Sequence, residues 1–190
     1  MGGFHFDEMQ LNLTRQLDLF ANELQSYVKD SEKRGFLRKV LRKNKRRKPV
    51  MGFYIYGGVG RGKTMLMDLL FKKIKISSKK RFHFHEFMRD VHEEIRSAKE
   101  RKIEDPIELV AGKIFENISL ICFDEMQISD IADAMLVGRL FEKIVNMQIS
   151  FICTSNRKPG DLYKDGLNRE LFLPFIDLLE SNLKIFPLNA

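Results

Sequence analysis

The sequence has few cysteines and no long apolar run. Cys122 and Cys153 are the two cysteines among 190 residues, and both lie in short apolar runs typical of strands. Buried free thiols in a reducing compartment, most simply the cytoplasm, are therefore expected. No apolar run approaches the ~20 residues that a membrane-spanning helix needs. The first residues also lack the basic and apolar regions of a secretory signal.

Acidic side chains are missing from residues 34–48, which contain nine lysines and arginines. Subtracting these nine charges from the net charge of +7 leaves −2 for the rest of the chain, so the basic character belongs to one segment. The first half of this basic tract interleaves apolar residues with cations, as in a basic amphipathic helix. The tract could contact nucleic acid or an anionic membrane surface. A flexible, solvated connector is the alternative, and we favour it.

Glycines cluster in one loop. The pattern Gly57-x-x-x-x-Gly62-Lys63-Thr64 matches the phosphate-binding P-loop at every required position. A strand-like run at residues 51–56 precedes it and a helical pattern at residues 65–74 follows, as P-loop chemistry requires. In such a loop backbone N–H groups and the helix dipole surround a polyphosphate. The predicted phosphate-binding residues are Gly57, Gly58, Val59, Gly60, Arg61, Gly62, Lys63, Thr64 and Met65.

Two side chains give this loop its chemistry. Lys63 is predicted to reach the β- and γ-phosphates of ATP, and the Thr64 hydroxyl is predicted to hold Mg²⁺. A glycine-rich turn that contains Lys-Thr by chance is the alternative. The agreement of strand, glycines, Lys-Thr and helix argues against that alternative, so ATP and Mg²⁺ are the expected ligands.

The chain alternates strand and helix patterns after residue 50. Its length and its content of 44% hydrophobic and 31% charged residues suit one soluble globular domain. The alternation predicts an α/β fold: a parallel sheet with helices on both faces, forming a three-layer sandwich. The predicted strands cover residues 51–56, 81–87, 118–123, 149–154 and 183–188. The predicted helices cover residues 63–75, 88–102, 106–116, 130–147 and 159–181.

An N-terminal helix is predicted ahead of this core. Apolar side chains recur at helical spacing between residues 6 and 29, namely at Leu11, Leu17, Phe20, Leu24 and Val28. The helix could pack beside the adenine, or it could only cover the edge of the sheet. We therefore divide the chain into a helix and basic linker over residues 1–48 and a nucleotide-binding core over residues 49–190.

An apolar run over residues 119–123 ends in two adjacent carboxylates, Asp124 and Glu125. This is the Walker B arrangement. Asp124 is predicted to join Thr64 in holding Mg²⁺, and Glu125 to polarise the water that attacks the γ-phosphate. A strand that ends in acidic residues is a weak signal alone, but about 60 residues downstream of a P-loop it becomes strong.

Two polar residues follow the fourth predicted strand. The amide of Asn156 could orient the attacking water or contact the γ-phosphate, and an Asx turn that closes the strand is the alternative. Arg169 lies in a predicted helical stretch from which it could reach the nucleotide of a neighbouring subunit. A solvated or salt-bridged surface arginine is the alternative.

Three histidines could contribute to a metal site. If residues 81–87 form a strand, His83 and His85 share one face of it, and His92 follows. Because no cysteine or further histidine lies nearby to complete a zinc site, structural or nucleotide-sensing roles are favoured.

The chain resembles the AAA+ ATPases, and more narrowly the ZapE-type family of bacterial cell-division ATPases with mitochondrial relatives. The resemblance covers residues 50–188 closely. It is carried by the P-loop, by Phe82-His-Phe-His-Glu-Phe-Met88, by Cys122-Phe-Asp-Glu-Met-Gln-Ile-Ser-Asp-Ile-Ala-Asp-Ala-Met135, by Thr154-Ser-Asn156, by Leu162-Tyr-Lys-Asp-Gly-Leu-Asn-Arg169 and by Phe172-Leu-Pro-Phe-Ile176.

The resemblance implies a P-loop sheet with strand order 5-1-4-3-2, Asn156 as sensor 1 and Arg169 as an arginine finger. It also implies a homo-oligomeric ATPase with a protein client, in cell division or protein quality control. The family pattern continues into a helical lid with sensor 2, whereas this sequence stops at Ala190, so the lid is expected to be absent.

Other functions are also consistent with these residues. A helicase-loader-like ATPase could use the basic tract to bind DNA or RNA, and a remnant could bind ATP without hydrolysing it. The intact Lys63, Asp124 and Glu125 argue against the remnant. A small-molecule kinase is least favoured, because Asp124-Glu125 followed by Asn156 suits water activation better.

Overall fold

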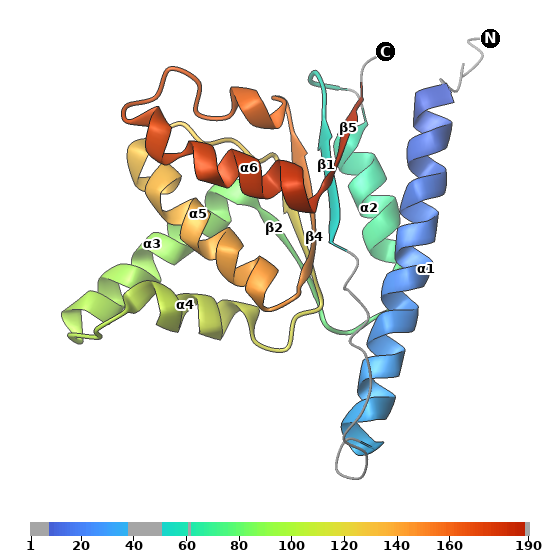
Figure 1. Ribbon diagram of the computed structural model, residues 1–190, viewed down its shortest axis with the longest axis horizontal. Coiled ribbons are helices and arrows are strands. Elements are labelled where there is room, and N and C mark those ends of the chain that lie inside the picture. Colours follow the sequence, from blue (N-terminus) through green and yellow to red (C-terminus); the bar gives the residue numbers. More distant parts are fainter. Residues whose placement is uncertain (1–7, 38–50, 61, 189–190) are drawn as a thin grey trace.

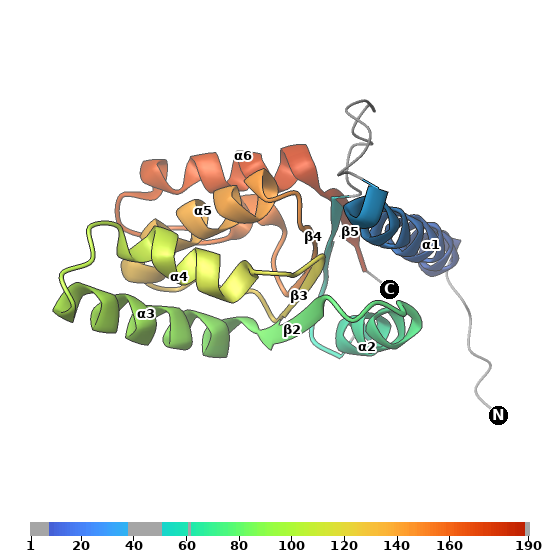
Figure 2. The ribbon, with the colours of Figure 1, turned by 90° about the horizontal axis from the view of Figure 1, so that it is seen from below.

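The structure of the chain is a computed structural model that describes residues 8–37, 51–60 and 62–188, with side chains of the first helix described from residue 11 to residue 31. Figure 1 shows helices on both sides of a central sheet, and Figure 2 shows the same layers edge-on. The predicted three-layer α/β fold is therefore confirmed. Most of the basic tract and all of Arg61 lie outside the described residues.

The sheet consists of five parallel strands in the order β2-β3-β4-β1-β5. Read from its other edge, this is the order 5-1-4-3-2 that the resemblance implied. The carboxyl ends of all five strands therefore meet at one edge, where ligands bind in such sheets. The strands are β1 (Gly52–Tyr56), β2 (Lys79–His83), β3 (Leu120–Asp124), β4 (Ser150–Ser155) and β5 (Lys184–Pro187).

The described residues also form six α-helices and two short 3₁₀ turns. Local capping starts two of the helices, since the Asp105 carboxylate accepts a hydrogen bond from Glu108 N and the Asp130 carboxylate accepts one from Asp133 N. The elements are α1 (Glu8–Leu37), α2 (Lys63–Lys73), α3 (Phe84–Glu100), α4 (Pro106–Phe115), α5 (Ile131–Asn146) and α6 (Leu173–Asn182), with η1 (Pro159–Asp161) and η2 (Arg169–Leu171).

Each face of the sheet has its own apolar core. Successive strand residues point to opposite faces, so Phe53 and Ile55 pack with α1 and α2 while Tyr54 packs on the other side. The helices α3, α4, α5 and α6 cover that other side (Figure 2). Because both faces are buried, the strands are apolar almost throughout, as is usual for parallel sheets.

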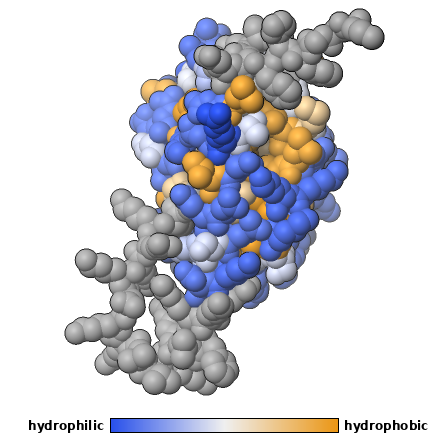
Figure 3. Space-filling model, turned by 90° about the vertical axis from the view of Figure 1, so that its right-hand side faces the viewer, coloured by the Kyte–Doolittle hydropathy of each residue, from blue (hydrophilic) through white to orange (hydrophobic). Residues whose placement is uncertain are grey.

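The first helix covers the sheet on the side of β1. Its buried side chains include Leu17 and Phe20, and the Phe20 ring meets the Phe53 ring edge-on with centroids 5.4 Å apart. Leu11, the first of the apolar residues at helical spacing, is 43% exposed. The outward face on this side of the molecule is largely hydrophilic, interrupted by apolar patches (Figure 3). Within the described residues, no helix is both long and apolar enough to cross a membrane.

The strand predicted at residues 81–87 is wrong in its second half. β2 ends at His83 and α3 begins at Phe84. The buried residues Phe84, Phe87, Met88 and Val91 repeat at helical spacing, and this periodicity outweighs the short alternation of aromatic residues before it. His83 and His85 consequently do not share one face of a strand.

Two predicted helix ranges also need correction. The N-terminal helix extends to Leu37, beyond the predicted end at residue 29. The helix predicted at residues 159–181 is confined to Leu173–Asn182, with η1 and η2 before it. The backbone between these turns is left-handed at Tyr163, Asp165 and Asn168, and three such residues interrupt a helix.

Candidate nucleotide-binding site

The P-loop runs from the end of β1 to the start of α2. Its first residue is tied to the sheet, because Gly57 N donates a hydrogen bond to Ser155 O over 3.2 Å. A Cβ at Gly57 would lie 2.3 Å from Leu188 O, so only glycine fits there. Gly62 has a φ of +78° immediately before α2, a conformation that glycine adopts without strain. The loop thereby directs the N-terminus of α2 toward the predicted phosphate site.

Lys63 lies folded over this loop. Its Nζ donates hydrogen bonds to Gly57 O at 2.8 Å and to Gly58 O at 2.7 Å, and the residue is 7% exposed. Burial lowers the pKa of Lys63, while the nearby carboxylates of Asp124 and Glu125 act in the opposite direction. The ammonium group is therefore held inside the loop by two carbonyl oxygens that a phosphate could replace.

The predicted magnesium ligands lie together. Asp124 is fully buried at the end of β3, and Thr64 Oγ1 at the start of α2 donates to Asp124 Oδ1 over 3.4 Å. Both side chains offer hard oxygen atoms at the carboxyl edge of the sheet, which is the donor chemistry that Mg²⁺ prefers. These residues therefore fit a magnesium ion held between α2 and β3.

β4 holds the predicted magnesium ligand Asp124 and the predicted base Glu125 in place. Thr154 Oγ1 donates to Asp124 Oδ1 and accepts a hydrogen bond from Glu125 N at 3.0 Å. Thr154 O accepts from Met126 N at 2.7 Å, and Ser155 Oγ donates to Met126 O at 2.7 Å. These bonds hold Glu125 at a φ of +56°, which is uncommon outside glycine, and leave its side chain exposed.

Arg81 is a site residue that the sequence analysis did not identify. Its Nη2 donates to Asp124 Oδ2 at 2.7 Å, and its Nη1 donates to Asp68 Oδ1 on α2. Burial would raise the pKa of Asp124, but hydrogen bonds from Thr154 and Arg81 outweigh burial and hold that pKa below its usual value. The available signal was weak, because Arg81 is the first residue of the strand predicted at residues 81–87, which the strand order implied by the resemblance places beside the Asp124 strand.

The predicted sensor follows β4 directly. Asn156 is exposed and comes one residue after Ser155, whose carbonyl binds the start of the P-loop. The next residue, Arg157, is bound to β1, because the hydroxyl of the buried Tyr54 donates a hydrogen bond to Arg157 O at 2.9 Å. Asn156 therefore lies at the same edge as the P-loop, on a segment held by β1.

Arg169 lies in η2, on the long connection between β4 and α6. Its Nη1 donates to Leu162 O at 2.7 Å and its Nη2 donates to Gly160 O at 2.6 Å. The guanidinium thus fastens the connection within its own chain. Whether it also serves a neighbouring subunit stays a prediction.

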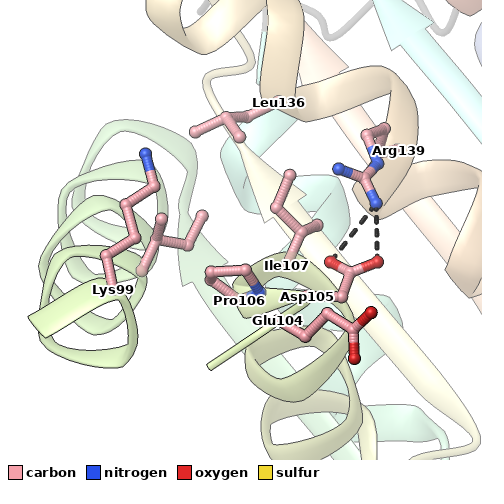
Figure 4. A pocket seen from close by; sticks show the side chains of 8 residues that line it. Lys99, Glu104, Asp105, Pro106, Ile107, Leu136 and Arg139 are labelled. Carbon is pink, nitrogen blue, oxygen red and sulfur yellow. Dashed lines mark hydrogen bonds and ion pairs between the residues drawn. The ribbon is translucent and has the colours of Figure 1, made fainter. Parts of the chain in front are cut away.

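The third candidate histidine, His92, lies on α3. His92 Nε2 is 2.7 Å from Asp133 Oδ1, which pairs α3 with α5. Between α3, α4 and α5 lies an open hollow of about 610 Å³, in which Arg139 and Asp105 form an ion pair at 3.0 Å (Figure 4). None of the residues that line it belongs to the P-loop. This hollow is therefore separate from the nucleotide-binding site.

The chain is similar to proteins of a known ATPase family. Residues 1–190 match the family described as AFG1-like ATPase. The cell division protein ZapE of Escherichia coli K12 is 35% identical over 195 residues, covering 100% of this chain and 52% of ZapE. Lactation elevated protein 1 homolog B of Danio rerio is 47% identical over 151 residues, covering 75% of this chain and 30% of that protein.

The fold also has a solved counterpart. The crystal structure of DnaI superposes with a TM-score of 0.64 at 12% identity, covering 100% of this chain and 86% of DnaI, and at this identity it shows the fold alone. The chain spans about half the length of ZapE and less of the zebrafish protein. The family match and the identity to ZapE both cover the whole chain, so it belongs to the AFG1-like ATPase family, with an AAA+ P-loop fold.

Proposed function

We propose that this chain binds Mg·ATP and hydrolyses its γ-phosphate. The observation that carries the proposal is the convergence of Lys63, Thr64 and Asp124 at one edge of the sheet, with Glu125 beside them. This set combines a phosphate-binding cation, two magnesium ligands and a carboxylate that can act on water.

Some of the site residues bind ATP and magnesium, and others act in hydrolysis. Lys63 exchanges its two carbonyl acceptors for phosphate oxygens when ATP enters. Thr64 and Asp124 hold magnesium, which when bound neutralises charge on the phosphate oxygens. Glu125, exposed at the end of β3, orients and deprotonates the attacking water, and Asn156 contacts the γ-phosphate or this water.

We expect Lys63→Ala to weaken ATP binding by about 100-fold, because charged hydrogen bonds worth about 3 kcal/mol are lost. Isothermal titration calorimetry with Mg·ATP measures the effect. Lys72→Ala, which removes an exposed lysine from the same helix, is the control and should leave the affinity unchanged. An equal loss in both variants would mean that general charge, and not the P-loop lysine, determines affinity.

We further propose that the chain assembles with copies of itself and acts on a protein client. ZapE is named a cell division protein, and its 35% identity over this whole chain supports a client protein that acts in cell division. The flanks of Arg169 support assembly, since Leu167 and Leu171 are 70% and 57% exposed and offer an apolar contact.

The basic tract is expected to be separable from ATP binding. Changing its lysines and arginines to glutamine should leave ATP affinity within about twofold, because the tract precedes the first strand and contains no phosphate-binding motif. If the tract binds polyanions, retention on heparin should fall in a salt-dependent way. Unchanged retention would identify residues 34–48 as a solvated connector.

A further inference from the structure

Arg81 joins three elements around the magnesium site. It lies on β2, the edge strand, and its guanidinium contacts Asp124 on β3 and Asp68 on α2. The Asp124 side chain is 1% exposed, that of Arg81 25% and that of Asp68 40%. The arginine therefore bridges a buried carboxylate and a more exposed one.

Arg81 contacts one carboxylate oxygen of Asp124, and the two threonine partners contact the other. Thr64 and Thr154 both donate to Oδ1, and Arg81 donates to Oδ2. An ionised carboxylate at this depth needs a counter-charge, because burial without one is costly. Among the described residues, Arg81 is the cation in direct contact with Asp124.

We propose that Arg81 is a positioning residue that serves as the resident counter-ion of the magnesium site. The inference rests on the proposed function, in which Asp124 holds magnesium. The guanidinium of Arg81 compensates the buried negative charge of Asp124 and fixes the direction of its carboxylate before nucleotide arrives. A divalent cation beside Asp124 repels the guanidinium, so Arg81 makes the site disfavour free Mg²⁺ and accept it together with the negative charge of ATP.

The surroundings of Arg81 allow its guanidinium to move away from Asp124. Asp68 lies one helical turn after Thr64, so the arginine keeps a carboxylate partner when it leaves Asp124. An open hollow of about 310 Å³ adjoins it at the edge of the sheet, lined by Arg81, Phe82, His83, Glu86, Phe87 and Asp90. Glu86 and Asp90 add negative charge to that hollow. The guanidinium can therefore move outward without leaving a carboxylate-rich surface.

The test measures the melting temperature of the nucleotide-free chain in EDTA and in millimolar Mg²⁺. Wild type should melt at nearly the same temperature in both. Arg81→Gln keeps one hydrogen-bond donor but removes the charge, so it should melt several degrees lower in EDTA and recover most of the loss with Mg²⁺. Arg81→Lys keeps the charge and should behave more like wild type. Titration with Mn²⁺ should show about tenfold tighter binding in Arg81→Gln.

The control is Arg89→Gln, which removes an exposed arginine paired with Asp90 at 3.1 Å and should not create a response to Mg²⁺. The proposal is overturned if Arg81→Gln melts lower by the same amount with and without Mg²⁺, if it melts like wild type in EDTA, or if Mg²⁺ alone already stabilises wild type. ATP titrations of wild type with and without Mg²⁺ distinguish a failure of the proposed function from a failure of the counter-ion role. Binding that ignores Mg²⁺ would refute the proposed function, whereas Mg²⁺-dependent binding with no new response in Arg81→Gln would refute only the counter-ion role.

Discussion

Replacement of Glu125 by glutamine is expected to stop ATP hydrolysis while leaving ATP binding within a few-fold of wild type. The carboxylate is exposed at the end of β3, whereas the binding groups Lys63, Thr64 and Asp124 remain intact. Because a positioned general base contributes about 10²–10⁴ in rate, phosphate release should fall by that factor. Calorimetric titration beside a phosphate-release assay measures both quantities on the same preparation.

Glutamine at position 125 preserves the size of the side chain and leaves the backbone N–H bonded to Thr154. Glu142→Gln, an exposed change on α5, is the matched control and should alter neither quantity. If Glu125→Gln loses binding as severely as Lys63→Ala, Glu125 acts in binding or folding and the assignment of a base is wrong. If hydrolysis persists near the wild-type rate, another group activates the water.

The parts of the site that lie within one motif could be predicted from the sequence. The P-loop fixes its own geometry through glycines and a helix N-terminus, so Lys63 and Thr64 could be placed without knowing the rest of the fold. Asp124 could be placed at the end of its strand because an apolar run followed by two carboxylates has a clear boundary. The parallel strand order then brings both motifs to one edge.

The partners contributed by other strands could not be predicted. Arg81 reaches Asp124 because Arg81 pairs in register with Cys122, two residues before the carboxylate. Thr154 reaches the same carboxylate from the other neighbouring strand. A shift of one residue would turn either side chain to the opposite face, and register depends on the packing of the whole sheet. The sequence shows which strands exist but not how they align.

The predicted boundaries of strands and helices are wrong where two periodicities overlap. Residues 82–85 alternate aromatic and histidine side chains, which indicates a strand, but the buried Phe84, Phe87 and Val91 belong to a helical repeat that continues for four turns. Around residue 165 the apolar spacing suggests a helix, while backbone in the left-handed region breaks it. Tertiary packing decides both cases.

Arg169→Ala is expected to lose most ATPase activity, and the loss should be repaired by a partner that cannot itself bind ATP. Both acceptors of the Arg169 guanidinium are neutral carbonyl oxygens, so within the described residues its charge has no carboxylate partner and is available to a phosphate. An arginine that stabilises transition-state charge contributes about 10³–10⁵ in turnover. Exposed Leu167 and Leu171 beside it suit contact with a second copy of the chain.

The measurement mixes Arg169→Ala, which keeps an intact P-loop, with Lys63→Ala, which keeps the arginine. If Arg169 acts across subunits, the mixture should recover activity that neither variant shows alone, and recovery should rise with protein concentration. The melting temperature of Arg169→Ala is the control, because loss of the bonds to Gly160 and Leu162 lowers stability in every mixture alike. A rate that is independent of concentration and unrepaired by mixing would show that Arg169 only fastens its own connection between β4 and α6.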